Sequence, residues 1–220
     1  MNSFIKKIVW PIMAIPALFL AIVWRKLPET VAVHFDLKGN PDRYGGKSEL
    51  LYTTMILVVM NVLVYLILTN IYRIDPKKYA AENKDRLVKI AFAVAIFMSG
   101  ILCMIIYSAW NGNISFSTGI IFSGTGLLFA VIGNYLPNLK PNYFAGLRLP
   151  WTLENEDNWR KTHKLAGKLW FAGGLLLAVI CLFLPPVAAI VVFFTIMMII
   201  TIIPCIYSYR LYTEQKKLSK

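Results

Sequence analysis

The sequence predicts an all-α fold, a polytopic membrane helical bundle with six transmembrane helices. Hydrophobic residues make up 58% of the 220 residues, and the mean hydropathy is +0.61. Charged residues make up 15%, whereas about 25% is typical of soluble domains. Six apolar stretches approach the roughly 20 residues that a helix needs to cross a bilayer. Lipid is therefore the expected solvent for most of the chain, and the expected location is the cell membrane, as a multi-pass protein.

The six predicted spans alternate with polar loops. They are Ile8–Trp24, Leu51–Tyr72, Ile90–Trp110, Phe116–Leu136, Leu169–Leu184 and Val187–Tyr209. Only five residues separate the third span from the fourth, which predicts a tight antiparallel hairpin. Small residues let helix backbones approach closely inside lipid, so the glycines of spans four and five predict close helix contacts. These glycines are Gly119, Gly124, Gly126, Gly133, Gly167, Gly173 and Gly174.

The basic residues predict the orientation of the spans. No Asp, Glu, Lys or Arg occurs in 90–139 or in 169–209, so the charges gather at the span ends. Eighteen of the 23 Lys and Arg residues lie in the N-terminus, the second loop, the fourth loop and the C-terminus. Short cytoplasmic loops accumulate Lys and Arg, which predicts that both termini are cytoplasmic (N-in/C-in). The net charge of +12 then favours anionic lipids as partners and gives no support to direct nucleic-acid binding.

Loop lengths predict three regions. Residues 1–72 hold the first two spans and an extracytoplasmic loop, 25–50. Residues 73–89 form a basic cytoplasmic loop. Residues 90–220 form a four-span module whose cytoplasmic loop, 137–168, is its most informative part.

The extracytoplasmic loop predicts a small extended segment over the first two spans. Thr30–Phe35 is mostly β-branched or aromatic, and Gly39–Asp42 is a strong turn signal. His34, Asp36 and Asp42 could be read as a metal or proton site, but their spacing matches no known ligand pattern. We expect turn chemistry and salt bridges to Arg43 and Lys47 instead, and no metal.

The cytoplasmic loop begins irregularly and becomes helical. Thr152 is a suitable N-cap, and acidic residues follow it, as the positive end of a helix favours. Trp159, His163, Ala166 and Trp170 recur every three to four residues and therefore share one helix face. We expect an interfacial cytoplasmic helix that runs into span five.

Two segments resemble a known family. The string Gly146–Leu153, followed by Glu156 and Trp159, resembles the signature of the SdpI family of bacterial membrane proteins. The loop Leu27–Lys47 resembles a short domain of unknown function that commonly precedes it. The resemblance implies an immunity or resistance protein. The family's namesake protects a sporulating bacterium from its own secreted peptide toxin and holds a repressor at the membrane. A peptide toxin and a cytoplasmic transcriptional repressor are thus the implied partners.

The resemblance also selects candidate residues. In the cytoplasmic motif they are Gly146, Arg148, Pro150, Trp151, Thr152, Glu156 and Trp159. In the extracytoplasmic loop they are Pro28, His34, Asp42 and Lys47. Arg148 can pair bidentately with a carboxylate or a phosphate, as partner binding would require. The alternative is that Arg148 anchors the loop to lipid while Trp151 and Trp159 belong to the aromatic belt.

Absent motifs argue against catalysis and ion coupling. Coupled transporters place ionisable residues inside the membrane, and the predicted spans hold none. The sequence also lacks H-E-x-x-H, Gly-x-Ser-x-Gly and Walker-type motifs, so we expect no enzyme, no catalytic residues and no cofactor. Two other functions stay open: a permease or lipid-interacting transporter with the glycine-rich fourth span as a groove wall, and a scaffold that holds anionic lipid.

Overall fold

The computed structural model describes residues 2–36, 40–77, 79–112 and 118–218 and confirms the all-α membrane bundle. Within these residues, six helices are long and apolar enough to cross a membrane. They are α1 (Asn2–Val23), α2 (Lys47–Asn70), α3 (Lys84–Asn111), α4 (Thr118–Tyr135), α6 (Glu156–Ile180) and α7 (Pro186–Leu218). Several extend past the predicted spans because charged residues end an apolar stretch without ending a helix.

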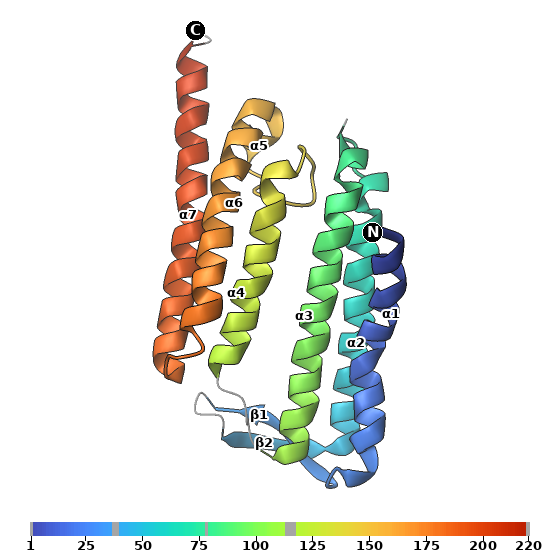
Figure 1. Cartoon of the computed structure of the whole chain (residues 1–220). Helices are drawn as coiled ribbons and strands as arrows, with labels where there is room; N and C mark the ends of the chain where they lie inside the picture. The colour runs from blue at the N-terminus through green and yellow to red at the C-terminus, as the bar shows by residue number, and fades with distance from the viewer. Residues whose placement is uncertain (1, 37–39, 78, 113–117, 219–220) are drawn as a thin grey trace.

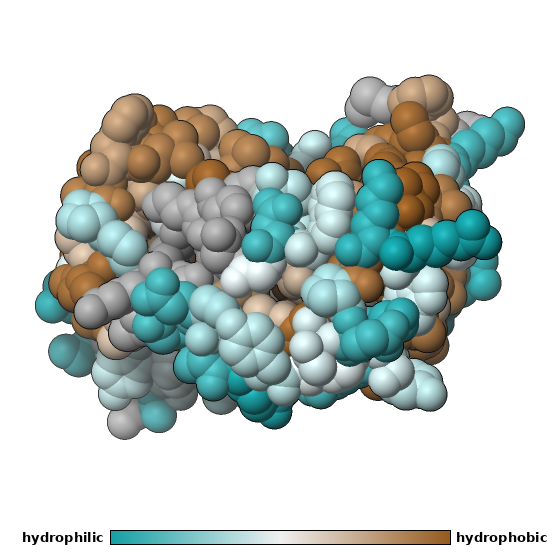
Figure 2. All heavy atoms as spheres, turned by 90° about the horizontal axis from the view of Figure 1, so that it is seen from below, coloured by the Kyte–Doolittle hydropathy of each residue, from teal (hydrophilic) through white to brown (hydrophobic). Residues whose placement is uncertain are grey.

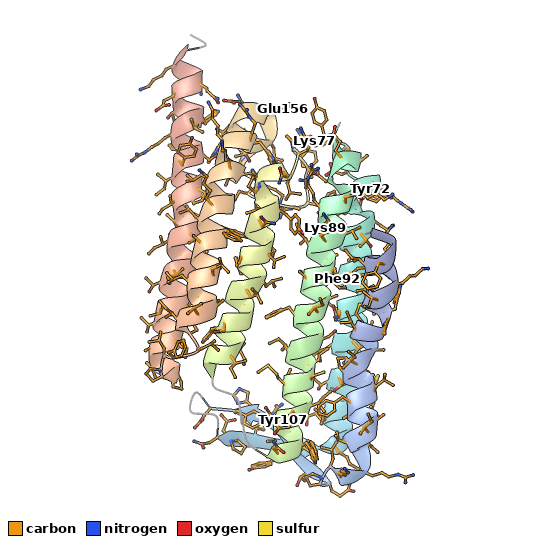
Figure 3. All side chains as sticks on the ribbon, viewed as in Figure 1. Tyr72, Lys77, Lys89, Phe92, Tyr107 and Glu156 are labelled. Atoms are coloured by element: carbon orange, nitrogen blue, oxygen red, sulfur yellow. The ribbon has the colours of Figure 1, made fainter. Side chains whose placement is uncertain are left out.

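The helices form two groups of three (Figure 1). One group is α1, α2 and α3, and the other is α4, α6 and α7. Helices α1 and α7 begin and end the chain at the same end of the bundle, as an even number of spans requires. The distribution of basic residues predicts that this end is cytoplasmic, and we call it the cytoplasmic end. Tyr72, Lys77, Lys89 and Glu156 lie near it, and Tyr107 lies near the opposite end (Figure 3).

The opposite, outer end carries a two-stranded antiparallel hairpin, β1 (Thr30–Phe35) and β2 (Pro41–Gly46). The predicted extended segment is confirmed. The predicted turn falls partly outside the described residues, and its last two residues begin β2, a strand that the sequence did not predict. The hairpin sits on the helix ends through the buried side chains of Val31, Leu50 and Ile106. Hydrophilic residues cover much of this end, with hydrophobic ones bordering it (Figure 2).

Helices α4 and α6 pack backbone against backbone. A Cβ atom on Gly126 would lie 2.8 Å from the carbonyl oxygen of Gly174, and one on Gly133 would lie 2.5 Å from the backbone nitrogen of Phe171. No side chain fits at such distances. The predicted close contacts are therefore confirmed here, although Gly124 faces the side chain of Phe97 on α3.

The predicted antiparallel arrangement of spans three and four is confirmed, but the two helices are not tightly packed. Helices α3 and α4 run antiparallel, but they contact each other far less than α4 and α6 do. An apolar groove of about 400 Å³ lies between them, lined by residues such as Phe97, Ile101, Met104, Gly124 and Leu128. A short connection keeps two helix ends close together but does not determine how tightly the helices pack. The glycine face of α4 packs on α6 instead.

Short helices complete the chain. They are η1 (Trp24–Lys26), η2 (Ile71–Arg73), η3 (Ala80–Asn83), η4 (Leu136–Asn138) and α5 (Pro150–Glu154). All but η1 lie at the cytoplasmic end of the bundle. The proposed division of the chain at residue 90 stays a prediction, and α3 packs chiefly with α1 and α2.

Candidate functional site

The motif loop, residues 139–149, has no regular secondary structure and is folded by side chains that replace backbone partners. Asn142, only 2% exposed, accepts hydrogen bonds at Oδ1 from the backbone of Phe144 and Ala145 (2.9 and 2.7 Å). Its Nδ2 donates to the carbonyls of Lys140 and Ala145 (2.9 and 3.1 Å). This Asx-type turn gives an irregular segment a fixed shape.

The glycine of the motif lies against a buried histidine. Gly146 has a φ of +101°, a region that side chains disfavour, and a Cβ there would collide with Nε2 of His163. The next backbone N–H, that of Leu147, donates to the same Nε2 at 3.0 Å. Nδ1 of His163 lies 2.8 Å from the carbonyl of Trp159. Nε2 must accept and Nδ1 must donate, so the geometry selects the neutral imidazole protonated at Nδ1.

Thr152 joins the loop to the helix that follows. Its hydroxyl accepts from the Leu149 N–H and lies 2.9 Å from the Leu147 carbonyl, to which it donates. The side chain is fully buried. Thr152 was predicted as the N-cap of the helix, which is wrong. It is the third residue of α5, which starts at Pro150, and Asn155 caps α6 by accepting from the Asn158 N–H (2.9 Å).

Trp151 anchors the site to α7 through a buried polar network. Its indole nitrogen donates to Oγ of Ser208 (2.8 Å), and Ser208 donates to Oδ1 of Asn158 (2.8 Å). Asn158 donates back to the Ser208 carbonyl (3.0 Å), and Thr162 donates to Asn158 (3.0 Å). Asn158, Thr162 and Ser208 are fully buried. Their mutual hydrogen bonds offset the cost of burying polar groups.

Trp159 is a core residue. It is 1% exposed, its ring stacks on His163 with 3.9 Å between centroids, and its indole nitrogen donates to the Leu139 carbonyl (2.8 Å). The predicted stripe of Trp159, His163 and Ala166 does share one face. That face lies against the motif loop, so the aromatic-belt alternative is wrong for Trp159.

Gly146, Arg148, Pro150 and Glu156 are the exposed residues of the motif. The guanidinium of Arg148 donates to the Tyr143 carbonyl at 2.7 Å, which holds its position without burying its charge. Glu156 is the first residue of α6, where a negative charge favours the helix dipole. The structure thus divides the seven motif residues into internal supports and an exposed surface, and their functional roles stay predictions.

Residues of the first helix group hold the loop from the other side. Asn83, fully buried, makes paired hydrogen bonds with the backbone of Lys140 (2.8 and 3.1 Å). Asp75 accepts from the Tyr143 N–H (3.0 Å), and Nζ of Lys77 donates to the Leu153 carbonyl (2.7 Å). We call the contacts of Asn83 and Asp75 with the loop, together with the contact of Lys77 with Leu153 of α5, the cytoplasmic clasp.

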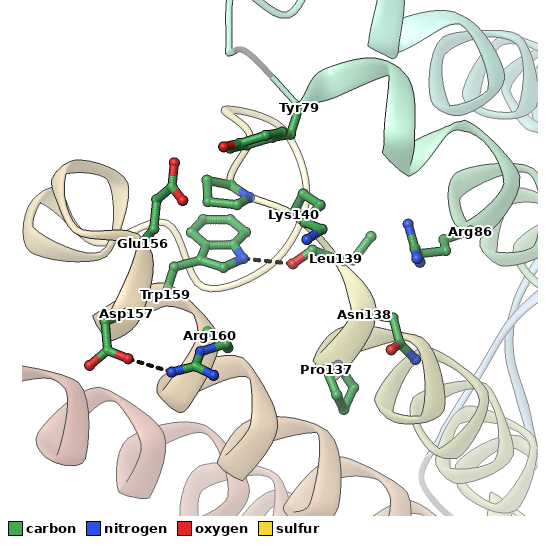
Figure 4. A pocket seen from close by; sticks show the side chains of 11 residues that line it. Tyr79, Arg86, Pro137, Asn138, Leu139, Lys140, Glu156, Asp157, Trp159 and Arg160 are labelled. Atoms are coloured by element: carbon green, nitrogen blue, oxygen red, sulfur yellow. Dashed lines mark hydrogen bonds and ion pairs between the residues drawn. The ribbon is translucent and has the colours of Figure 1, made fainter.

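A cavity of about 530 Å³ lies beside the clasp (Figure 4). Its lining includes the cations Arg86, Lys140 and Arg160 and the carboxylates Glu156 and Asp157. Asp157 is paired with Arg160 and with Lys161, each at 2.7 Å. The mixed charges suit a polar protein surface better than a single anion.

The four extracytoplasmic candidates lie at the outer end, away from the motif. Pro28 is exposed, His34 contacts Asp42 (2.5 Å), and Lys47 pairs with Glu29 (2.6 Å). The expected salt bridges to Arg43 and Lys47 are wrong in their partners. Both cations pair with glutamates, because the hairpin folds back onto the start of α2, where Arg43 meets Glu49 (3.0 Å).

The outer end also holds a pocket of about 300 Å³ beneath the hairpin. The Arg43–Glu49 pair belongs to its lining, which is otherwise mostly apolar. Among the residues that the structure describes, no group of three or more His, Cys, Asp or Glu is arranged to hold a metal.

Sequence reasoning missed several supports of the site. Asn83, Asn142, Asn158 and Ser208 are buried polar residues that lie outside the string of motif residues. The one available signal was residue type. Uncharged polar residues among the charged residues of the helix ends and the loop could have indicated buried hydrogen-bonding positions. His163 was placed on the correct face, but its bond to Leu147 depends on a tertiary contact.

Comparison with known proteins agrees with this geometry. The model of the SdpI/YfhL protein family matches residues 138–208, which span the motif loop, α5, α6 and most of α7. The model of a domain of unknown function, DUF1648, matches residues 12–66, which span most of α1, the hairpin and most of α2. The chain is 24% identical over 165 residues to Immunity protein SdpI of Bacillus subtilis (strain 168), covering 74% of each chain. No solved structure matches. With six membrane-length helices and this similarity, the chain is a multi-pass cell-membrane protein whose residues 138–208 are similar to the SdpI/YfhL protein family.

Proposed function

We propose that the chain is a non-enzymatic membrane immunity protein, which protects the cell against a secreted peptide toxin and relays its presence to a cytoplasmic transcriptional repressor. Similarity to Immunity protein SdpI supports the immunity part. The observation that carries the proposal is the layout of the two helix groups. They are separated by an apolar groove along the spans and joined by the cytoplasmic clasp at the motif loop.

The groove suits an apolar peptide. The pocket beneath the hairpin and the groove between α3 and α4 are both lined by Ile101 and Met104, so the two apolar spaces adjoin along α3, and we propose that together they offer the peptide a path from the outer end toward the membrane. A toxin that acts on membranes needs an apolar face, and burial of that face in the path keeps it out of lipid. The Arg43–Glu49 pair offers polar contacts at the pocket.

The clasp gives the relay a physical basis. Four hydrogen bonds from Asn83, Asp75 and Lys77 cross between the helix groups. Each contributes about 1 kcal/mol net, so a ligand that changes the spacing of α3 and α4 has enough binding energy to open or tighten the clasp. The exposed Arg148, which continues from the same loop, would then change its presentation to a cytoplasmic partner.

Deleting the gene tests the immunity function. Loss of the protein should increase the sensitivity of growing cells to culture supernatant of the same or a related bacterium. Protease treatment of the supernatant should remove the effect, because the toxin is a peptide. Equal survival of deleted and wild-type cells in untreated supernatant contradicts the proposal.

Asn83→Ala tests the relay separately. The variant loses two bonds of the clasp, so it should fail to change repressor-controlled expression on exposure to supernatant while still reaching the membrane. Thr125→Ala is a suitable control, because among the described residues the hydroxyl of Thr125 bonds only to the Ile121 carbonyl of its own helix. An unchanged response of Asn83→Ala argues against transmission through the clasp.

A lipid-interacting transporter or permease is the second candidate. The apolar groove, with Gly124 of α4 in its wall, is the observation that favours it. This function predicts substrate flux in proteoliposomes without any added toxin. Flux that depends on the protein would favour transport, and protection without flux would favour immunity.

A further inference from the structure

A second cytoplasmic cavity, distinct from the motif site, lies among α1, α2, η2 and the start of α3. Its volume is about 250 Å³. Its lining is Lys6, Trp10, Tyr65, Thr69, Asn70, Tyr72, Arg73 and Lys84. Three cations from three separate elements thus face one space, and the lining contains no carboxylate. The cavity beside the clasp differs, since two carboxylates line it.

The cations are held in place by aromatic and polar neighbours. Nε of Arg73 donates to the hydroxyl of Tyr72 at 3.2 Å, and Nζ of Lys84 lies 5.1 Å from the centroid of the Tyr72 ring. None of the six ion pairs found among the described residues includes Lys6, Arg73 or Lys84. Positive charges that converge without a carboxylate repel one another, and a bound anion removes this cost.

The cavity opens at the level of the membrane surface. Trp10 is 48% exposed and packs edge-on against Tyr65, with 6.1 Å between ring centroids. Amphipathic aromatic rings of this kind occupy the headgroup region of a bilayer. Below Asn70, exposed apolar side chains descend α2 at three- to four-residue spacing, and they are Leu66, Leu63 and Val59. A molecule whose anionic head fills the cavity can therefore lay an acyl chain along this helix.

We propose that this cavity binds the phosphate group of an anionic phospholipid from the cytoplasmic leaflet. Arg73 and Lys84 supply the charge, Lys6 closes the site from α1, and Trp10 packs beside the glycerol region. The volume fits a headgroup and not a drug-sized ligand, for which pockets of about 300–1,000 Å³ are usual. The site ties the three helices of the first group together and is independent of the proposed immunity function.

Thermal unfolding of the purified full chain in nonionic detergent tests the site. Added phosphatidylglycerol should raise the Tm, and phosphatidylcholine should not. In Arg73→Gln/Lys84→Gln, the apparent affinity for phosphatidylglycerol should fall about thirtyfold. Each Lys or Arg near an anionic lipid surface contributes about 1 kcal/mol of attraction, and the variant loses two of them. Lys164→Gln/Lys168→Gln removes the same charge from the exposed side of α6 and should keep nearly all of the affinity.

The remaining arms separate the explanations. Arg73→Lys/Lys84→Arg keeps the charges and should keep the affinity, and circular dichroism of each variant shows that it is folded. Inorganic phosphate carries the same anionic group without acyl chains, and it should give little stabilisation at matched concentration. Equal losses in the two glutamine pairs overturn the site. Stabilisation by inorganic phosphate equal to that by phosphatidylglycerol overturns the assignment to a lipid.

Discussion

The imidazole of His163 occupies the space into which a side chain on Gly146 would project, and it also receives the N–H of Leu147. Gly146 in the motif loop and His163 in α6 therefore pack directly against each other. The contact fixes the path of the loop that displays Arg148.

Gly146→Ala should destabilise the protein by about 2–4 kcal/mol, because positive φ and a collision with His163 both act against the methyl group. Thermal unfolding in detergent measures the loss. Gly112→Ala is the matched control: Gly112 has a φ of +73°, but nothing lies within 4 Å of a Cβ there. It should therefore lose only the backbone part, about 1 kcal/mol.

A double-mutant comparison tests the cause. In a His163→Ala background the ring is gone, so adding Gly146→Ala should cost close to what Gly112→Ala costs. An unchanged cost of Gly146→Ala in that background would show that the collision with His163 is not the reason.

Ser208→Ala should lower the free energy of unfolding by about 1–3 kcal/mol, since it leaves the Trp151 indole N–H and the Asn158 amide oxygen with a lost partner. Chemical unfolding followed by tryptophan fluorescence gives the value. Trp151→Phe removes the donor itself. If Trp151 and Ser208 act through one hydrogen bond, the two substitutions together should cost clearly less than the sum of each alone.

The sequence could predict the features that depend on hydropathy and on small residues. The six helices followed from hydropathy because every backbone polar group in lipid must be bonded within its own helix. Close backbone contacts at Gly126, Gly133 and Gly174 followed from the sequence, because only small residues allow such an approach, but the pairing of α4 with α6 did not. Hydropathy is a property of a single segment, and glycine in a membrane helix often marks a close helix contact. Both can therefore be recognised without knowing the tertiary partners.

The supports of the motif loop could not be predicted in this way. The bond between Trp151 and Ser208 joins residues 57 positions apart, and the bond between Asn83 and Lys140 joins residues equally far apart. Strand β2 was missed because Pro41, Gly45 and Gly46 are poor strand formers, and its pairing with β1 outweighs their local preference. Tertiary partners decide each of these features.

Gly174→Ala should weaken the packing of α4 on α6, because its methyl group would lie 2.5 Å from the Gly126 carbonyl oxygen and from the Ala130 backbone nitrogen. We expect a loss of about 1–3 kcal/mol, seen as a lower Tm in detergent. Gly100→Ala on α3 is the control, since nothing lies within 4 Å of its added Cβ. It should be neutral or slightly stabilising, as alanine favours a helix over glycine. Equal Tm values for the two variants would contradict the packing argument.

Arg148→Ala should separate partner binding from folding. The side chain is exposed, and its one hydrogen bond among the described residues goes to the Tyr143 carbonyl in the same loop, so the Tm should change little.

The guanidinium of Arg148 is also the motif's one cation, and it is held at the surface in a fixed position. Under the proposed relay, a fluorescently tagged cytoplasmic repressor should therefore leave the membrane in Arg148→Ala cells, while the membrane content of the protein stays at the wild-type level. Lys164→Ala removes a charge from an exposed position of α6 outside the motif and should keep the repressor at the membrane. Retention of the repressor by Arg148→Ala, or equal loss in both variants, would show that the motif acts through general charge or through its buried supports, and not through Arg148.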